Sequence, residues 1–272
     1  MPDPGGRMKD QAAVEHGAAR SGVRSAVRDD VLYVTLDAPP VNVMTGAMMG
    51  ELSDVLARGN ADATLKAIAL DAVGKAFCAG ADVGEHRPEQ APAMIAGFSR
   101  LFRALGASEL PVVMAVDGAA LGAGFELALM ADILVASERA TFGQPEIRLG
   151  FFAPVGVAWL AARVGVARAV EITSTGRTYT AGEMHAMGLV SRLVPPERLS
   201  DEREQILGDL RRASPVVMRM NVRLTRALAG RPFEEARVEA ERVFLGELMA
   251  TDDVREGIAS FYEKRRPVWQ NR

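Results

Sequence analysis

Glu126 and Glu146 are the side chains of this 272-residue sequence best suited to proton-transfer chemistry. They stand 20 residues apart (146 − 126), far enough to lie on different elements and still meet in space. Two carboxyl groups can divide the roles of general acid and general base when their surroundings hold their pKa values apart. Taken singly, each has a simpler explanation: Glu126 as an acidic residue in a first helical turn, Glu146 as a solvated loop residue.

Two glycine-bearing turns, residues 74–82 and 117–126, each follow an expected strand. Small residues let a ligand approach the main chain, and N–H groups at the start of a helix are unpaired donors that suit a developing oxyanion. Either turn alone is better explained as a tight connection between strand and helix. Gly118, Gly122 and Gly124 lack the spacing Gly-x-Gly-x-x-Gly, which argues against a dinucleotide cofactor.

Apolar periodicity predicts the elements that must position these residues. We expect strands at 31–36, 66–72, 111–116 and 132–136, with helices at 47–58 and 91–105 and around Glu126. This alternation predicts an α/β core with mostly parallel pairing. After Pro154 we expect six helices, at 155–174, 180–187, 196–212, 215–228, 232–248 and 252–263. The domain prediction is a flexible leader over 1–22, a core over 23–195 and a helical region over 196–272.

Composition narrows the class of protein. The net charge of −3 gives no electrostatic signature for nucleic acid or an anionic membrane. Charged residues and prolines interrupt the two most apolar stretches, so neither is a good transmembrane helix. The single cysteine, Cys78, and the three histidines have no zinc-site spacing, and we expect no metal. The single cysteine cannot form an internal disulfide, which fits a reducing compartment. Residues 1–30 also lack the apolar stretch of a secretory signal, so we expect a cytoplasmic location.

Three segments taken together resemble the crotonase (enoyl-CoA hydratase/isomerase) superfamily. They are Phe-Cys-Ala-Gly-Ala-Asp at 77–82, the run from Gly118 to Glu126, and Phe-Gly-Gln-Pro-Glu-Ile at 142–147. The resemblance runs from about residue 23 to the end and includes Pro-Pro-Val-Asn at 39–42 and Phe-Tyr-Glu-Lys-Arg at 261–265. It implies a spiral of β-β-α units with a helical C-terminal trimerisation region, assembled as a homotrimer or a dimer of trimers.

The resemblance also implies a site. The oxyanion hole falls on the backbone N–H groups of Ala81 and of Ala123, which stands where the family usually has glycine. Glu126 would activate a water molecule and Glu146 would transfer the proton to the α-carbon. Further substrate contacts are expected at Ala79, Gly80, Asp82, Gly122, Phe152, Pro154 and Lys264. The substrate is an acyl-coenzyme A thioester, and no separate cofactor is expected.

Departures from the family pattern bear on the acyl group. The segment at 150–159 is more apolar than in many hydratases. Its Phe-Ala-Pro-Val part, together with Pro-Pro-Val-Asn-Val-Met at 39–44, is similar to the cyclohexadiene-carbonyl-CoA hydratase subgroup. Lys264 would meet coenzyme A phosphate from a neighbouring subunit, although an exposed basic helix end explains it equally well. Cys78 is expected to be a small buried hydrophobe, and His86 is either exposed or reaches the pocket.

Hydration is the leading hypothesis because both glutamates are present, whereas family isomerases often keep only one. Another crotonase reaction, double-bond isomerisation above all, remains an alternative. A non-catalytic acyl-CoA-binding protein with the same fold is a second alternative, since fold alone does not prove function.

Overall fold

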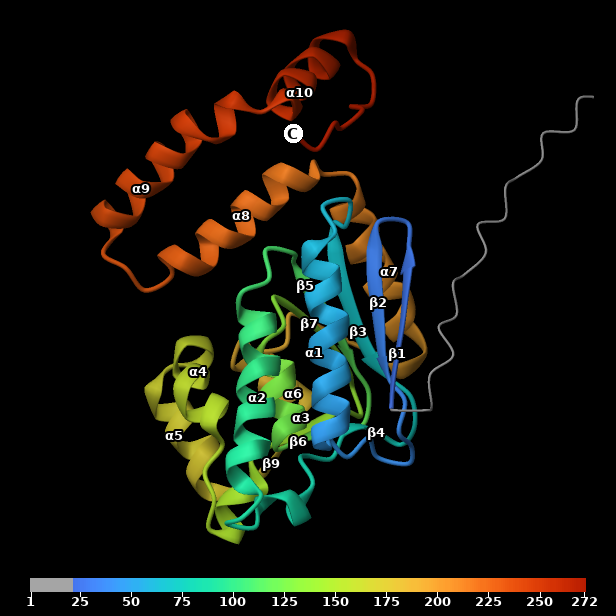
Figure 1. Cartoon of the computed structure of the whole chain (residues 1–272), viewed down its shortest axis with the longest axis vertical. Helices are drawn as coiled ribbons and strands as arrows, with labels where there is room; N and C mark the ends of the chain where they lie inside the picture. Colours follow the sequence, from blue (N-terminus) through green and yellow to red (C-terminus); the bar gives the residue numbers. More distant parts are fainter. Residues whose placement is uncertain (1–21) are drawn as a thin grey trace, which may run out of the picture.

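The computed structural model describes residues 22–272 and forms two β-sheets surrounded by helices (Figure 1). The expected leader, 1–22, lies outside the described residues except for Gly22. From residue 67 to residue 175 the chain follows the same path three times. Each repeat adds one strand to the large sheet, one strand to the small sheet and then a helical segment. This is the α/β spiral that the sequence resemblance implied.

The large sheet has six strands in the order β1-β2-β3-β5-β7-β10. β1 and β2 pair antiparallel, and the other neighbours pair parallel. The strands are β1 (Val23–Arg28), β2 (Val31–Leu36), β3 (Ala67–Ala72), β5 (Val112–Val116), β7 (Ile133–Ser137) and β10 (Arg192–Val194). Side chains alternate between the two faces, as the pleat requires. In β3, for example, Ile68 and Leu70 enter the main core, while Ala67 and Ala69 pack in a second cluster with Leu207 of α7 (Leu199–Arg211).

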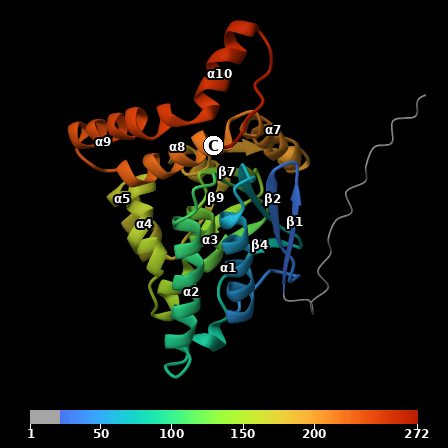
Figure 2. The ribbon, with the colours of Figure 1, turned by 45° about the horizontal axis from the view of Figure 1, so that its top comes forward.

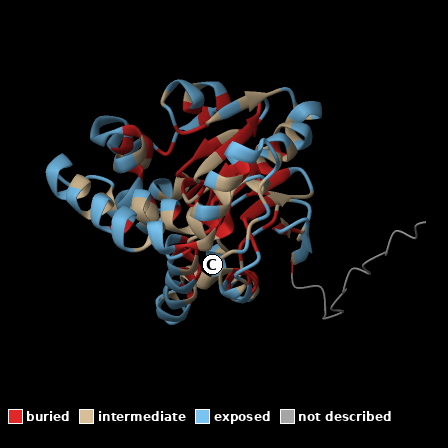
Figure 3. Ribbon diagram, turned by 90° about the horizontal axis from the view of Figure 1, so that it is seen from above, coloured by how far each residue is buried: buried red, intermediate tan, exposed pale blue. Residues whose placement is uncertain are grey.

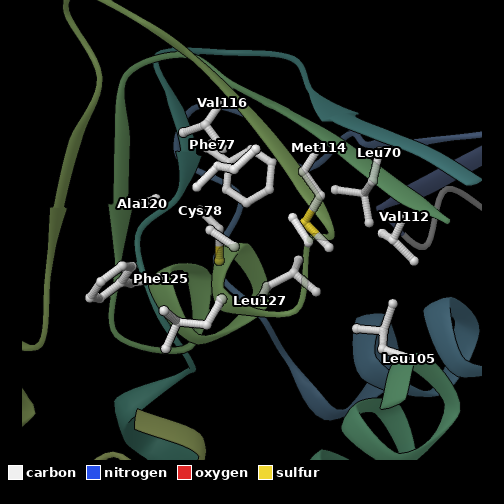
Figure 4. Close-up of a cluster of buried hydrophobic side chains, with 14 of the residues drawn as sticks. Leu70, Phe77, Cys78, Leu105, Val112, Met114, Val116, Ala120, Phe125 and Leu127 are labelled. Atoms are coloured by element: carbon white, nitrogen blue, oxygen red, sulfur yellow. The ribbon is translucent and has the colours of Figure 1, made fainter. Parts of the chain in front are cut away.

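The small sheet has the order β4-β6-β8-β9. Its strands are β4 (Ala76–Cys78), β6 (Ala119–Leu121), β8 (Thr141–Gly143) and β9 (Thr178–Thr180). β4, β6 and β8 are parallel neighbours, so the turns that follow them meet at one edge of the sheet. Phe77, Cys78 and Ala120 anchor these strands in the main core, near Phe125 and Leu127 (Figure 4).

The remaining helices surround the sheets. They are α1 (Gly46–Ala61), α2 (Ala91–Gly106), α3 (Ala123–Leu129), α4 (Pro154–Val164), α5 (Val166–Thr175), α6 (Ala181–Ala186), α8 (Pro215–Leu228), α9 (Phe233–Gly246) and α10 (Asp252–Glu263). Short 3₁₀ helices are η1 (Val83–His86), η2 (Pro145–Leu149), η3 (Pro196–Arg198) and η4 (Leu248–Ala250).

The last helices form an arm. α8, α9 and α10 lie at one end of the molecule, and the ends of β4 and β6 lie towards the other (Figures 1 and 2). Burial is concentrated in the sheets, and the outer helices are mostly exposed or intermediate (Figure 3). Large apolar side chains remain exposed on the arm, among them Phe233, Leu245, Phe261 and Tyr262. Within the described part of the chain, no helix combines the length and the apolar character needed to cross a membrane.

The structure corrects several sequence predictions. The single helix predicted at 155–174 is two helices, because Gly165 takes a φ of 83° between α4 and α5. The helix predicted at 196–212 begins as the 3₁₀ helix η3. The small sheet was not predicted, since strands of three residues have too few positions to show a period. The boundary at 195/196 stays a prediction; it falls between β10 and η3, and α7 after it packs on the large sheet.

Candidate active site

The loop around residue 42 is hydrogen-bonded to the connection that leads from β3 into β4. Asn42, with a φ of 53°, is fully buried. Its amide nitrogen donates to three carbonyl oxygens at 2.7–3.1 Å, those of Val73, Ala76 and Phe77. Asparagine tolerates this left-handed conformation better than most residues. One buried side chain therefore ties the loop around residue 42 to both ends of the connection that enters β4.

The same loop sets the direction of the Ala81 N–H group. Met44 donates to the Gly80 carbonyl at 2.9 Å and accepts from the Asp82 N–H at 3.2 Å, which forms a parallel bridge with Ala81. In such a bridge the central residue of the partner segment turns its own N–H group to the opposite side. Ala81 therefore presents its N–H away from Met44.

The turn after β6 supplies a second N–H group beside the first. Gly122 has a φ of 54° and precedes Ala123, the first residue of α3, whose N–H has no partner within the helix. A Cβ atom on Gly122 would lie 3.6 Å from the Cα atom of Gly80, so the two turns are in contact. It would also lie 2.7 Å from Oε1 of Glu146, so any side chain here would displace that carboxylate. Gly122 therefore lies next to both the turn after β4 and the Glu146 carboxylate.

Glu126 lies in the first turn of α3 and is only 2% exposed. Its Oε1 accepts from the N–H groups of Val155 at 2.6 Å and Gly156 at 3.0 Å, near the start of α4. Pro154 occupies the first position of α4, where a missing N–H costs nothing. The carboxylate of one helix therefore caps the next helix through a single oxygen.

Burial is the main cause that raises the pKa of Glu126, to about 7, and the charge of Glu146 adds to it. The two backbone N–H groups act in the opposite direction, because they stabilise the ionised form. A carboxyl group with a pKa near neutrality exchanges protons readily at physiological pH, which is a property of general acids and bases.

Glu146 lies in η2, directly after β8, and burial also raises its pKa, while the charge of His86 lowers it. Gln144, which is 1% exposed, lies beside it. With the amide nitrogen of Gln144 turned towards Glu146, it donates to both carboxylate oxygens at 3.0 Å. The hydrogen-bonding partners decide this amide orientation. Glu146 is thus held by one buried side chain over Gly122.

The other predicted contacts divide into two groups. Ala79 is exposed and Gly80 buried in the turn after β4, while Phe152, 67% exposed, lies in the loop before α4. Asp82 lies in the turn, but its carboxylate accepts from the Gly84 N–H at 2.7 Å and so caps η1. Lys264 ends α10, on the arm at the other end of the molecule, and the structure does not bring it to this site within the chain.

Cys78 has no role in this chemistry. Its side chain is fully buried among apolar residues (Figure 4), and burial raises the pKa of its thiol to about 11. A thiol rather than a thiolate is a poor nucleophile. The prediction of a small buried hydrophobe is confirmed.

Comparison with known proteins agrees with this geometry. The enoyl-CoA hydratase/isomerase family model matches residues 27–272. The chain belongs to this family. A cyclohexa-1,5-dienecarbonyl-CoA hydratase of Thauera aromatica is 36% identical over 247 residues, covering 89% of this chain and 93% of the relative. A probable enoyl-CoA hydratase of Mycobacterium bovis is also 36% identical, over 88% of this chain and 94% of the relative.

Solved structures of the family share the fold. An enoyl-CoA hydratase of Bacillus anthracis superposes with a TM-score of 0.87 at 27% identity, over 92% of this chain and all of that one. The chain is therefore an enoyl-CoA hydratase/isomerase family member in sequence and in fold. The crotonase resemblance carried by residues 77–82, 118–126 and 142–147 is confirmed.

Sequence reasoning missed some parts of this family member's site. Asn42 stands in a segment that resembles the family, but its unusual φ has no sequence signal beyond the residue type. Gln144 also stands in such a segment, and the sequence alone gave it no role. The N–H groups of Val155 and Gly156 leave no trace in side-chain types, although the proline before them marks a helix start.

Proposed function

We propose that this protein is an enoyl-CoA hydratase, which adds water across the α,β-double bond of an acyl-CoA thioester. The observation that carries the proposal is the position of Glu146 over Gly122, between the turns that hold Ala81 and Ala123. A thioester oxygen accepting from those two N–H groups would lie beside both carboxyl groups. Preorganised donors of this kind stabilise an enolate oxygen, and removing one costs about 10²–10³ in rate.

The addition balances with one proton on the glutamate pair. Glu126 takes a proton from water as its oxygen bonds to the β-carbon, and the electrons of the double bond move to the thioester oxygen. The enolate then takes a proton from Glu146 at the α-carbon. The pair holds one proton before and after the step: Glu146 carries it at the start and gives it to the α-carbon, and Glu126 ends the step with a proton taken from water.

The two pKa values bear on this assignment. Burial raises the pKa of Glu126 to about 7 and also raises the pKa of Glu146, which favours one proton on the pair near neutral pH. A proton on Glu146 is the starting arrangement for hydration, and a proton on Glu126 is the starting arrangement for the reverse dehydration. A water molecule bonded to both carboxyl groups would let the proton cross between them, and the pair titrates as one unit.

Partners and location complete the proposal. The arm of α8, α9 and α10 exposes Phe233, Leu245 and Phe261, which fits a homotrimer or a dimer of trimers. In that assembly Lys264 would meet coenzyme A phosphate at a neighbouring site. We propose no cofactor beyond the coenzyme A of the substrate. The free, buried thiol of Cys78 fits a cytoplasmic location.

For the acyl group we propose an alicyclic, cyclohexadiene-carbonyl-like substrate. The relative from Thauera aromatica carries that activity in its name, at 36% identity. The exposed apolar side chains of Phe151 and Phe152 stand in the loop between η2, which carries Glu146, and α4, which Glu126 caps. Flat aromatic side chains can stack on a flat unsaturated ring.

A panel of linear, branched and alicyclic enoyl-CoA esters tests both parts. Loss of the conjugated-thioester absorbance with a gain of one water in product mass supports hydration, while turnover without a change in mass would indicate isomerisation. Glu146→Gln should abolish the absorbance change, and full activity of that variant would refute the mechanism. Binding of saturated acyl-CoA with no turnover of any ester would favour a non-catalytic role.

A further inference from the structure

His86 ends η1, on the turn that carries Ala81, and its ring is fixed by a backbone contact. Nδ1 lies 2.9 Å from the carbonyl oxygen of Asp82. A carbonyl oxygen only accepts, so Nδ1 carries the hydrogen, and the neutral ring has its lone pair on Nε2. The ring is half-buried. His86 is therefore held in one orientation by the oxyanion-hole turn itself.

The ring also touches the segment that carries Glu146. The ring centroids of His86 and Phe151 are 5.1 Å apart, with the planes tilted by 53°. The N–H group of Phe151 donates to the carbonyl oxygen of Glu146 at 3.1 Å. A chain of contacts therefore runs from Asp82 through the two rings to the backbone of Glu146. It bridges the turn after β4 and the turn after β8 without involving the large core.

The positive charge that the ring carries when it is protonated also acts on Glu146. Protonated His86 lowers the pKa of Glu146, against the effect of burial. The other charged groups on η1 with its two cap residues, and on α2, which packs against it, are turned to other partners or to solvent. They are Asp82, bonded to the Gly84 N–H; Glu85, bonded to the Gly46 N–H; exposed Arg87 and Arg103; and Arg100, paired with Asp54.

We propose that His86 is a positioning residue of the hydration site, which holds the Glu146 turn against the oxyanion-hole turn through Phe151 and sets the charge beside Glu146. This proposal rests on the proposed function for its kinetic consequences. Its electrostatic part concerns the free protein and can be measured without turnover.

Two variants separate the ring contact from the charge. His86→Phe keeps an aromatic ring against Phe151 but removes the Nδ1–H group and the charge. His86→Gln removes the ring. His185→Phe is the matched control, because His185 also bonds a backbone carbonyl through Nδ1, that of Val190 at 2.8 Å, but from α6.

Loss of an aromatic contact in His86→Gln should lower kcat about 2- to 12-fold, with KM for the thioester unchanged. His86→Phe should keep kcat near neutral pH, while the acid limb of its pH profile moves to higher pH. The control should show neither change. If His86→Gln loses activity only in proportion to unfolded protein, and the acid limb of His86→Phe stays in place, a positioning role is overturned.

Titration of the Glu146 carboxyl group by carbon NMR, assigned with Glu146→Gln, tests the electrostatic part without substrate. His86→Phe should raise the pKa of Glu146, and an unchanged pKa would overturn the proposal. If the wild-type protein hydrates no enoyl-CoA ester, the proposed function fails, and this titration still tests the effect of His86 on Glu146 independently.

Discussion

Replacing Glu126 with glutamine should change catalysis and stability in opposite directions. Glutamine has the same shape and keeps an Oε1 atom that can accept from Val155 and Gly156, so the cap on α4 should survive. What it removes is a buried carboxyl group whose pKa is raised from 4.5 to about 7. The substitution therefore isolates the cost of ionising this residue inside the folded protein.

The size of that cost follows from the pKa difference. The folded protein holds the Glu126 proton more tightly than the unfolded chain by 7 − 4.5 = 2.5 pKa units, which corresponds to roughly 3 kcal/mol. This stabilisation is fully present below the unfolded pKa of 4.5 and is lost as pH rises through about 7. Between about pH 4.5 and pH 8 the wild-type protein should lose that amount through this residue alone. The variant should not.

Urea unfolding at about pH 5 and about pH 8.5 measures the difference, alongside initial rates of hydration. At the higher pH the variant should be the more stable by up to roughly 3 kcal/mol, while kcat/KM falls about 10²–10⁴-fold. Glu89→Gln makes the same chemical change on an exposed residue and should alter neither quantity. A Glu126→Gln protein with the pH dependence of the wild type, or with its activity, would refute the reasoning.

Three further outcomes follow from the site. The profile of kcat/KM against pH should fall as pH rises through about 7, because the pair then loses its shared proton; a flat profile from pH 6 to about 9 would contradict this. Gly122→Ala should abolish hydration and cost about 1–2 kcal/mol of stability, since φ is 54° and the new Cβ would lie 2.7 Å from Glu146, while Gly97→Ala, in open space on α2, should do neither. Alkylation with iodoacetamide at neutral pH should leave activity unchanged, because the Cys78 thiol is buried and its pKa is about 11; rapid inactivation would place a reactive thiol in the site.

Much of the large sheet could be predicted from the sequence because its strands carry their own signal. The expected strand at 66–72 differs by one residue from β3, and the strand at 31–36 matches β2. Most residues of both strands are buried, on both faces of the sheet, so apolar composition alone marks them. The strands of the small sheet have three residues each, too few to show a period in the sequence, and only their pairing with neighbouring strands defines them.

The candidate site was predictable only by resemblance. In its own sequence Glu126 is an ordinary acidic residue in a first helical turn, and the structure confirms that position. Its side chain, however, bonds to the start of a different helix, 29 and 30 residues downstream. No local pattern records a contact between turns, and the same is true of Glu146 over Gly122. The sequence identifies the candidate donors and carboxyl groups, but it does not show that they lie next to one another in the fold.

The cap that Glu126 provides for α4 also bears on the order in which segments of the chain can pack during synthesis. α3 leaves the ribosome before residues 155 and 156, whose N–H groups are the partners of the carboxylate. Until they arrive, burying Glu126 would leave its carboxyl group without these two hydrogen bonds, which is costly for any polar group. A nascent chain that ends before α4 should therefore keep α3 loosely docked. The centre of the site is completed by a segment made after all four of the residues Ala81, Ala123, Glu126 and Glu146.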